Sequence, residues 1–148
     1  MKLITRSALM FLCLIVASPV QSSASPADRE MRQVTRSLPA IDRIELQKVI
    51  SAELGIKSVE ATKTIQGQEA QKVARIWRAQ KFGGTGAACH SPAYAIKFFR
   101  RGKLIAYASL CWECSNISLL EPDLPSVGFN ARGRRGRELL EVFTKAFP

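Results

Sequence analysis

Hydrophobic and polar positions alternate in two segments near the start of the chain. In residues 41–50, Ile44 and Leu46 alternate with polar neighbours, as in a half-buried strand. Pro39 could also open a helix there, but the apolar residues of this segment spread widely around a helical wheel. Residues 57–65 are rich in β-branched side chains and alternate in the same way. The pattern predicts a strand in each segment.

The period changes to that of a helix in residues 68–81. Apolar residues recur there at i, i+3, i+4 and i+7: Ala70, Val73, Ala74 and Trp77. The predicted helix begins near Gly67. At this spacing we expect Trp77 to lie in the core. The glycine-rich residues 82–86 lack the Gly-Lys-Ser/Thr ending of a phosphate-binding loop, so we expect a flexible connection.

A β-hairpin is predicted from two further apolar and aromatic runs, residues 94–100 and 103–110, which flank a turn signal. If Arg101 and Gly102 form the two-residue loop, Arg100 pairs with Lys103. An uninterrupted register from this pair puts Tyr94, Ile96, Phe98, Tyr107 and Cys111 on one face and Ala95, Phe99, Leu104, Ala108 and Trp112 on the other.

The rest of the chain predicts a loop and a helix. The loop contains Pro122, Pro125 and Gly128, and residues 130–146 carry an apolar helical face. The order strand, strand, helix, strand, strand, helix favours an α+β fold with an about four-stranded antiparallel sheet and two helices packed on one face.

The N-terminus has the features of a secretory signal peptide. Lys2 and Arg6 precede an apolar run, residues 8–17, that is too short to span a bilayer. Ser22 and Ala24 are small residues at the −3 and −1 positions of a cleavage site. We expect cleavage after Ala24, with an uncleaved anchor as the alternative. The protein is then exported, to the periplasm or the extracellular space, and is not an integral membrane protein after cleavage.

The sequence therefore divides into a signal peptide over residues 1–24, a flexible leader over residues 25–38 and a single domain over residues 39–148. Loss of Lys2 and Arg6 reduces the formal net charge from +10 to +8. In an exported protein this charge favours an anionic envelope polymer, a lipid headgroup or an acidic protein as the partner, and disfavours nucleic acid.

Arginines gather at the start of the predicted C-terminal helix, where the helix dipole disfavours cations. We expect an anion-binding patch there, together with the basic hairpin turn: Arg132, Arg134, Arg135 and Arg137, with Arg100, Arg101 and Lys103. The alternative is a solvated basic turn.

Cleavage of the signal peptide removes Cys13 and leaves three cysteines. The uninterrupted hairpin register places Cys89 opposite Cys114, at a Cβ separation of about 4.5–5.5 Å that local twist can reduce to disulfide distance. Because the exported compartment is oxidising, we expect a Cys89–Cys114 disulfide with Cys111 as the spare thiol.

Other chemistry remains open for the same residues. His90 falls opposite Glu113 and diagonal to Cys111 in this register, so a reactive thiol cluster of Cys111, His90 and Glu113 is one hypothesis. The CxxC spacing of Cys111 and Cys114 suggests thiol redox chemistry, although it ends a strand and does not begin a helix. Cys89, His90, Cys111 and Cys114 also make up a four-ligand set for zinc, the one cofactor that the sequence suggests.

Residues 60–116 resemble a group of small exported bacterial proteins of uncharacterised function. The resemblance rests on the motifs Cys-His-x-Pro, Ile-Trp-Arg and Cys-Trp-Glu-Cys in this segment. It implies a shared domain and assigns no activity or site residues.

No complete catalytic set is evident, so the sequence favours a binding or structural module of the bacterial envelope over an enzyme. The alternative is a thiol-redox or zinc-binding protein that uses Cys89, Cys111 and Cys114.

Overall fold

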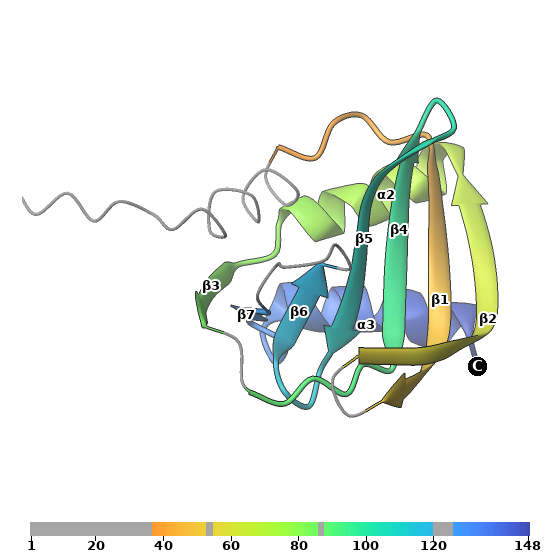
Figure 1. The fold of residues 1–148 in the computed structure, drawn as a ribbon. Coiled ribbons are helices and arrows are strands. Elements are labelled where there is room, and N and C mark those ends of the chain that lie inside the picture. Colours follow the sequence, from red (N-terminus) through yellow and green to blue (C-terminus); the bar gives the residue numbers. More distant parts are fainter. Residues whose placement is uncertain (1–36, 53–54, 86–87, 120–125) are drawn as a thin grey trace, which may run out of the picture.

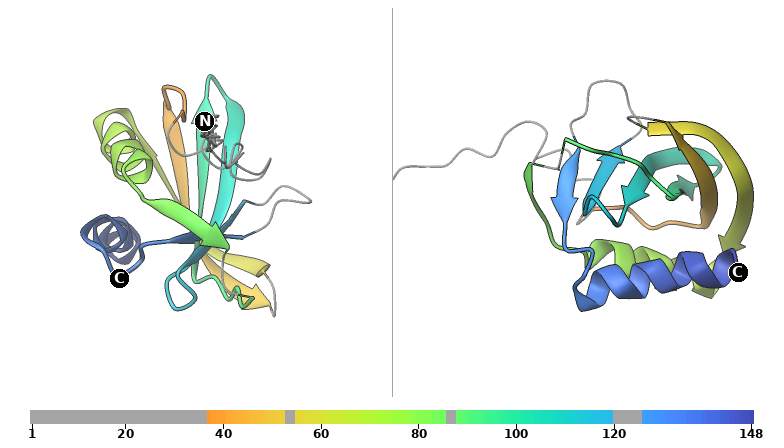
Figure 2. Two further views of the ribbon diagram at one scale, coloured as in Figure 1. Left: turned by 90° about the vertical axis from the view of Figure 1, so that its left-hand side faces the viewer. Right: turned by 90° about the horizontal axis from the view of Figure 1, so that it is seen from below.

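The described part of the protein is an antiparallel sheet covered on one face by two helices. The computed structural model describes residues 37–52, 55–85, 88–119 and 126–148. They form one seven-stranded sheet with the strand order β2-β1-β4-β5-β6-β7-β3. Figures 1 and 2 show both helices, α2 and α3, on the same face. The α+β prediction is confirmed, whereas about four strands was too few. The predicted signal peptide, Cys13 and residues 25–36 of the leader lie outside the described residues.

The first two strands follow the predicted alternation. β1 (Arg43–Ala52) pairs with β2 (Gly55–Gln66), and Ile44 and Leu46 are buried against the helices. β1 also pairs with β4 from Arg43 to Lys48, so the backbone hydrogen bonds of this part are satisfied on both sides. Leu38, the last residue assigned to the leader, is buried in the core, and its carbonyl accepts a bond from Arg78.

The hairpin is present, but a β-bulge changes its register. β4 (Tyr94–Arg100) and β5 (Lys103–Cys111) pair from Arg100–Lys103 as predicted. Arg101 and Gly102 both have positive φ, the conformation of a two-residue hairpin turn. The register shifts between Phe98 and Phe99, so that Phe98 lies opposite Ala106. One inserted residue exchanges the faces of the rest of the strand.

The predicted grouping of the hairpin side chains was therefore wrong. Tyr94, Ile96 and Phe98 face the helices and share that face with Leu110, whereas Cys111 alternates to the opposite face. The paired ladder ends at Tyr94–Leu110, so Cys89 and Cys114 do not belong to it.

Three short strands replace segments that the sequence predicted as connections. The glycine-rich segment is β3 (Phe82–Thr85), an edge strand that pairs with β7 (Val127–Phe129). β6 (Asn116–Leu119) follows a tight turn and pairs with β5 and β7. These strands are too short to show a period, and their pairing partners are distant in sequence.

The two helices supply the other half of the core, as predicted. Trp77 of α2 (Gly67–Arg78) is fully buried, with its ring 5.1 Å from that of Phe98. Phe143 of α3 (Arg134–Ala146) stacks on Tyr94 at 4.8 Å. Within the described residues, neither helix is long and apolar enough to cross a membrane.

Candidate functional site

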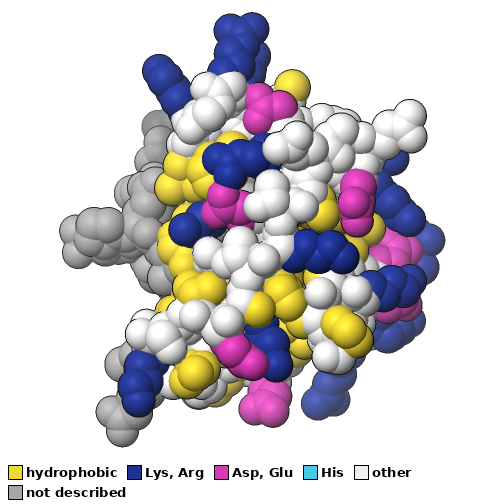
Figure 3. Space-filling model, turned by 90° about the vertical axis from the view of Figure 1, so that its right-hand side faces the viewer, with side chains coloured by type: hydrophobic (Ala, Val, Ile, Leu, Met, Phe, Trp, Pro, Cys, Tyr) yellow, Lys and Arg dark blue, Asp and Glu magenta, His cyan; other side chains and the backbone are white. Residues whose placement is uncertain are grey.

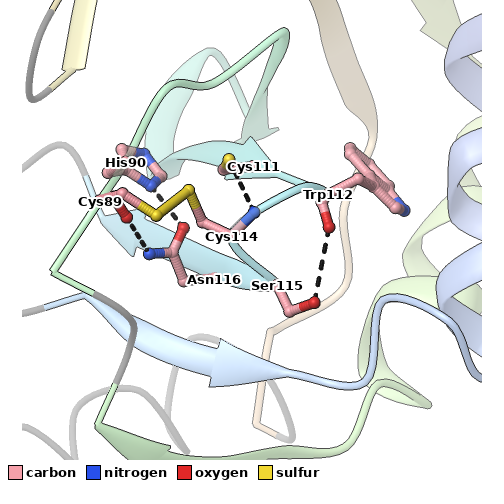
Figure 4. Close-up of a disulfide and its surroundings, with 7 residues drawn as sticks. All are labelled: Cys89, His90, Cys111, Trp112, Cys114, Ser115 and Asn116. Atoms are coloured by element: carbon pink, nitrogen blue, oxygen red, sulfur yellow. Dashed lines mark hydrogen bonds between the residues drawn. A yellow bond between two sulfur atoms is a disulfide. The ribbon is translucent and has the colours of Figure 1, made fainter.

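The predicted disulfide between Cys89 and Cys114 is present. It joins the segment that precedes β4 to the turn that follows β5, with a Cα–Cα distance of 6.2 Å (Figure 4). The cysteine pair was predicted correctly, although the hairpin register used to predict it is wrong because it lacks the β-bulge. The cysteines meet because both lie just beyond the ends of the paired strands.

His90 lies next to this disulfide, at the centre of a buried hydrogen-bond network (Figure 4). Its Nδ1 is 2.7 Å from Asn116 Oδ1, and its Nε2 is 2.7 Å from Ser109 Oγ. Asn116 Nδ2 donates to the carbonyl of Cys89 at 2.6 Å. This bond fixes the orientation of the amide, because in the flipped orientation Asn116 Oδ1 would face the carbonyl oxygen and no hydrogen bond would form. Nδ1 therefore carries a proton, and Nε2 bonds to the Ser109 hydroxyl, which also lies 3.4 Å from the carbonyl of Ser118.

A hydroxyl, an imidazole and a side chain that orients the ring also follow one another in serine hydrolases, but there the third side chain is a carboxylate and not an amide. Here the hydroxyl has no access to a substrate, because Ser109 and Asn116 are 0% exposed and His90 is 5% exposed. Buried polar groups that satisfy one another stabilise a single arrangement of the chain. The network therefore holds the disulfide segment against β5 and β6. Sequence analysis missed Ser109 and Asn116 because β5–β6 pairing brings them to His90.

Cys111 is a free, buried thiol. Its Sγ accepts a hydrogen bond from the backbone N–H of Cys114 at 3.2 Å (Figure 4). The structure does not bring the predicted thiol cluster together: both ring nitrogens of His90 bond elsewhere, and Glu113 is exposed in the turn.

Three of the four predicted zinc ligands also make other bonds in the structure. Cys89 and Cys114 are joined to each other, and His90 bonds to Asn116 and Ser109. Across the described ranges, no group of three or more His, Cys, Asp or Glu side chains has an arrangement suited to a metal ion.

The two predicted basic clusters lie in different parts of the molecule. Arg100, Arg101 and Lys103 are exposed at the β4–β5 turn, and the arginine-rich start of α3 lies beside β7 (Figures 1 and 2).

Glu138 compensates part of the charge at the start of α3. Arg135 and Arg134 lie 2.6 Å and 3.5 Å from its carboxylate. The hydrogen bond from Arg135 lowers the pKa of Glu138 below its ordinary value, and the charges of both arginines act in the same direction. Arg137 donates to the carbonyl of Arg132. Two of the four arginines thus have a carboxylate partner.

A groove of about 570 Å³ runs between α2 and α3. Its apolar lining is Leu46, Val73, Ile76, Ala79, Val142 and Ala146. Five basic side chains line it as well: Lys63, Lys72, Arg75, Arg135 and Lys145. Three carboxylates, Glu69, Glu138 and Glu141, oppose them. The groove is thus apolar at its base and carries a net positive charge, and its volume is that of a small-molecule site.

Of the residues predicted to bind anions, Arg135 lines this groove. In the helical pattern of α2, Lys72 and Arg75 fall on the polar face. The pattern alone does not distinguish them from cations that only face solvent. Only the packing of α3 alongside α2 makes them the wall of a groove.

Comparison of the chain with protein-family models, curated proteins and solved structures finds no match. The functional argument therefore rests on the geometry of the sites.

Proposed function

We propose that the mature chain is a binding module of the bacterial envelope, and that the groove between α2 and α3 binds an anionic envelope component. The observation that carries this proposal is the composition of the groove, in which five basic side chains and three carboxylates surround an apolar base. The resemblance to exported bacterial proteins and the signal-like N-terminus support the compartment. The Cys89–Cys114 disulfide is compatible with it.

The charge of the groove is only partly compensated within the protein. Glu138 bonds to Arg135, and Glu141 lies 3.6 Å from Lys145. Lys63, Lys72 and Arg75 are exposed and make no salt bridge within the described residues. An anionic ligand would gain from these cations without breaking an existing ion pair.

The test is a charge-matched comparison of two triple variants. We expect Lys63→Gln/Lys72→Gln/Arg75→Gln to reduce binding to phosphatidylglycerol vesicles or to lipopolysaccharide by at least tenfold. The matched control, Arg100→Gln/Arg101→Gln/Lys103→Gln, removes the same charge from the hairpin turn and should retain most of the binding. Co-sedimentation at low and moderate salt measures both, because screening weakens such contacts.

Equal loss of binding in the two variants would assign the effect to net charge and reject the groove. If the wild-type protein binds neither material, the proposed function itself is wrong.

Thiol–disulfide exchange is a second candidate, because Cys111 lies next to the disulfide in sequence and in space. The N–H of Cys114 bonds to Cys111 Sγ and holds it beside the disulfide. Attack of the Cys111 thiolate on Cys114 Sγ would form a Cys111–Cys114 bond and release Cys89 as a thiolate, with no external oxidant. Peptide mapping in a glutathione buffer tests the exchange, and Cys111→Ala is the control. A Cys89–Cys114 pair that persists throughout would reject it.

A further inference from the structure

We infer that the ligand of the α2–α3 groove is a single-chain amphiphile, with its alkyl chain along the apolar base and its anionic headgroup beside Lys63, Lys72 and Arg75. This inference rests on the proposed function and specifies the chemical class of the ligand. It follows from three properties of the groove: its length, its apolar base and the three cations of its wall that make no salt bridge within the described residues.

The two helices run antiparallel along the groove. Gln80, just after α2, donates from Nε2 to the carbonyl of Arg135, in the first turn of α3, at 2.9 Å. The end of α2 therefore meets the start of α3, and the two helices diverge from there towards the start of α2 and the end of α3 (Figure 1). The lining residues of α2 extend from Glu69 to Ala79. At 1.5 Å per residue this is a length of about 15 Å.

An alkyl chain matches the base of this groove. Leu46 and Val73 lie at the bottom and are nearly fully buried, while Ile76, Val142 and Ala146 keep part of their surface exposed. A length of about 15 Å accommodates an extended chain of roughly twelve carbons, since bonded carbons lie about 1.5 Å apart in a zigzag. Each buried methylene strengthens binding by about fourfold.

The charges of the groove wall are unequally compensated. Arg135 is engaged by Glu138, and Lys145 lies 3.6 Å from Glu141. The other three cations, Lys63 of β2 and Lys72 and Arg75 of α2, have no salt bridge within the described residues. Figure 3 views the molecule from the β2 side, where α2 begins and α3 ends, and shows hydrophobic side chains between those of Lys and Arg. The headgroup therefore belongs beside these three cations, and the alkyl chain belongs along the apolar base.

The experiment measures binding of saturated fatty acids of eight, ten, twelve and fourteen carbons to the full mature chain by calorimetry, below their micelle concentrations. We expect the affinity to rise about fourfold per methylene up to roughly twelve carbons and then to level off. Acetate is the headgroup-only control, and it should bind too weakly to measure.

Two variants test the site. Lys63→Gln/Lys72→Gln/Arg75→Gln should weaken dodecanoate at least tenfold without changing the dependence on chain length. Ala79→Phe should weaken dodecanoate, because the larger side chain fills part of the groove. Ala52→Phe, at an exposed position on β1, is the matched control. The chain-length series on the wild-type protein remains decisive if a variant does not fold.

The outcomes separate the two proposals. Retention on anionic vesicles without any dependence on chain length overturns the amphiphile and leaves the binding module intact. The same holds if an acidic peptide such as polyglutamate competes for the groove and dodecanoate does not bind. Absence of both retention and fatty-acid binding overturns both proposals.

Discussion

The hydrogen bonds of His90 illustrate how single residues are positioned in this protein. His90 is the one histidine of the chain, and its two ring nitrogens bond to Asn116 and Ser109 inside the protein. Because the carbonyl of Cys89 orients the Asn116 amide, the proton on Nδ1 of the imidazole follows from one backbone contact. At this scale the residues around the disulfide stabilise the fold, and the unpaired cations of the groove remain available for binding.

Asn116→Ala should lower the free energy of unfolding by about 3 kcal/mol, since it leaves the His90 N–H and the Cys89 carbonyl without these partners in a buried site. Ser109→Ala should cost about 1 kcal/mol, because it removes the bond to His90 and a long, 3.4 Å contact with the carbonyl of Ser118. Urea denaturation measures both. Ser115→Ala is the control, because its hydroxyl makes only a long, 3.5 Å contact with Trp112, and an Asn116→Ala effect no larger than this control would contradict the network.

Loss of the disulfide should lower the free energy of unfolding by about 3 kcal/mol. The estimate follows from the entropy that a bridge across a sequence separation of 25 removes from the unfolded chain. Denaturation of Cys89→Ser/Cys114→Ser gives the value directly. A reducing agent should destabilise the wild type by a similar amount and leave the double variant unchanged; sensitivity of the variant would point to a different bridge.

At the scale of elements, β-bulges, turns and close backbone contacts determine which side chains meet. The bulge in the hairpin puts Cys111 on the face of the sheet that has no helices. The start of α3 approaches the preceding turn closely at Gly136, and the carbonyl of Gly136 accepts a hydrogen bond from Trp112 Nε1 at 3.3 Å. These contacts set the position of α3 against the sheet, and so the width of the groove.

Gly136→Ala should destabilise the protein by about 2–3 kcal/mol, because a Cβ would lie 2.4 Å from the backbone oxygens of Asn130 and Ala131. Gly133→Ala is the matched control in the same turn. The atoms nearest to its Cβ would be those of the Asn130 side chain, which can rotate away, so we expect a cost below about 1 kcal/mol. Thermal unfolding distinguishes them, and equal costs would show that the turn relaxes around Gly136.

The salt bridges at the start of α3 should make a pH-dependent contribution to stability. Because the pKa of Glu138 is lowered in the folded state, its contribution is present above its ordinary pKa of 4.5 and is lost as the pH falls through the folded value. Glu138→Gln should therefore be less stable than the wild type near pH 6, and the difference should shrink towards pH 3. A difference that does not change with pH would contradict this coupling.

At the scale of the whole molecule, the compartment and the charge act together. Export would place a chain of formal charge +8 among anionic lipids and polymers, and the groove concentrates part of that charge over an apolar surface. The second basic cluster, at the hairpin turn, does not line the groove and serves as its internal control.

Expression of the full-length chain in a bacterial host should yield exported protein whose N-terminal residue is Ser25. Ala24→Trp should block processing, because a bulky side chain at the −1 position does not fit the cleavage rule, and precursor should accumulate. N-terminal sequencing and fractionation measure both. An unprocessed wild-type chain in the cytoplasm would reject export and, with it, the envelope ligand.

The sequence by itself predicted the elements whose pattern is local. Period-2 and helical alternation located β1, β2, the β4–β5 hairpin and both helices, because each buries one face of a long segment. The cysteines at positions 89 and 114 could be paired from the sequence, although the register used to pair them was wrong.

Only the tertiary structure determined the rest. β3, β6 and β7 exist through their pairing with distant strands, and the bulge at Phe98–Phe99 exchanges the faces of the hairpin. The His90 network needs β6 beside β5, and the groove needs α3 beside α2. Each depends on contacts between segments far apart in the chain, which the periodicity of one segment does not encode. For that reason the charge of α2 was visible in the sequence and its role as the wall of a binding groove was not.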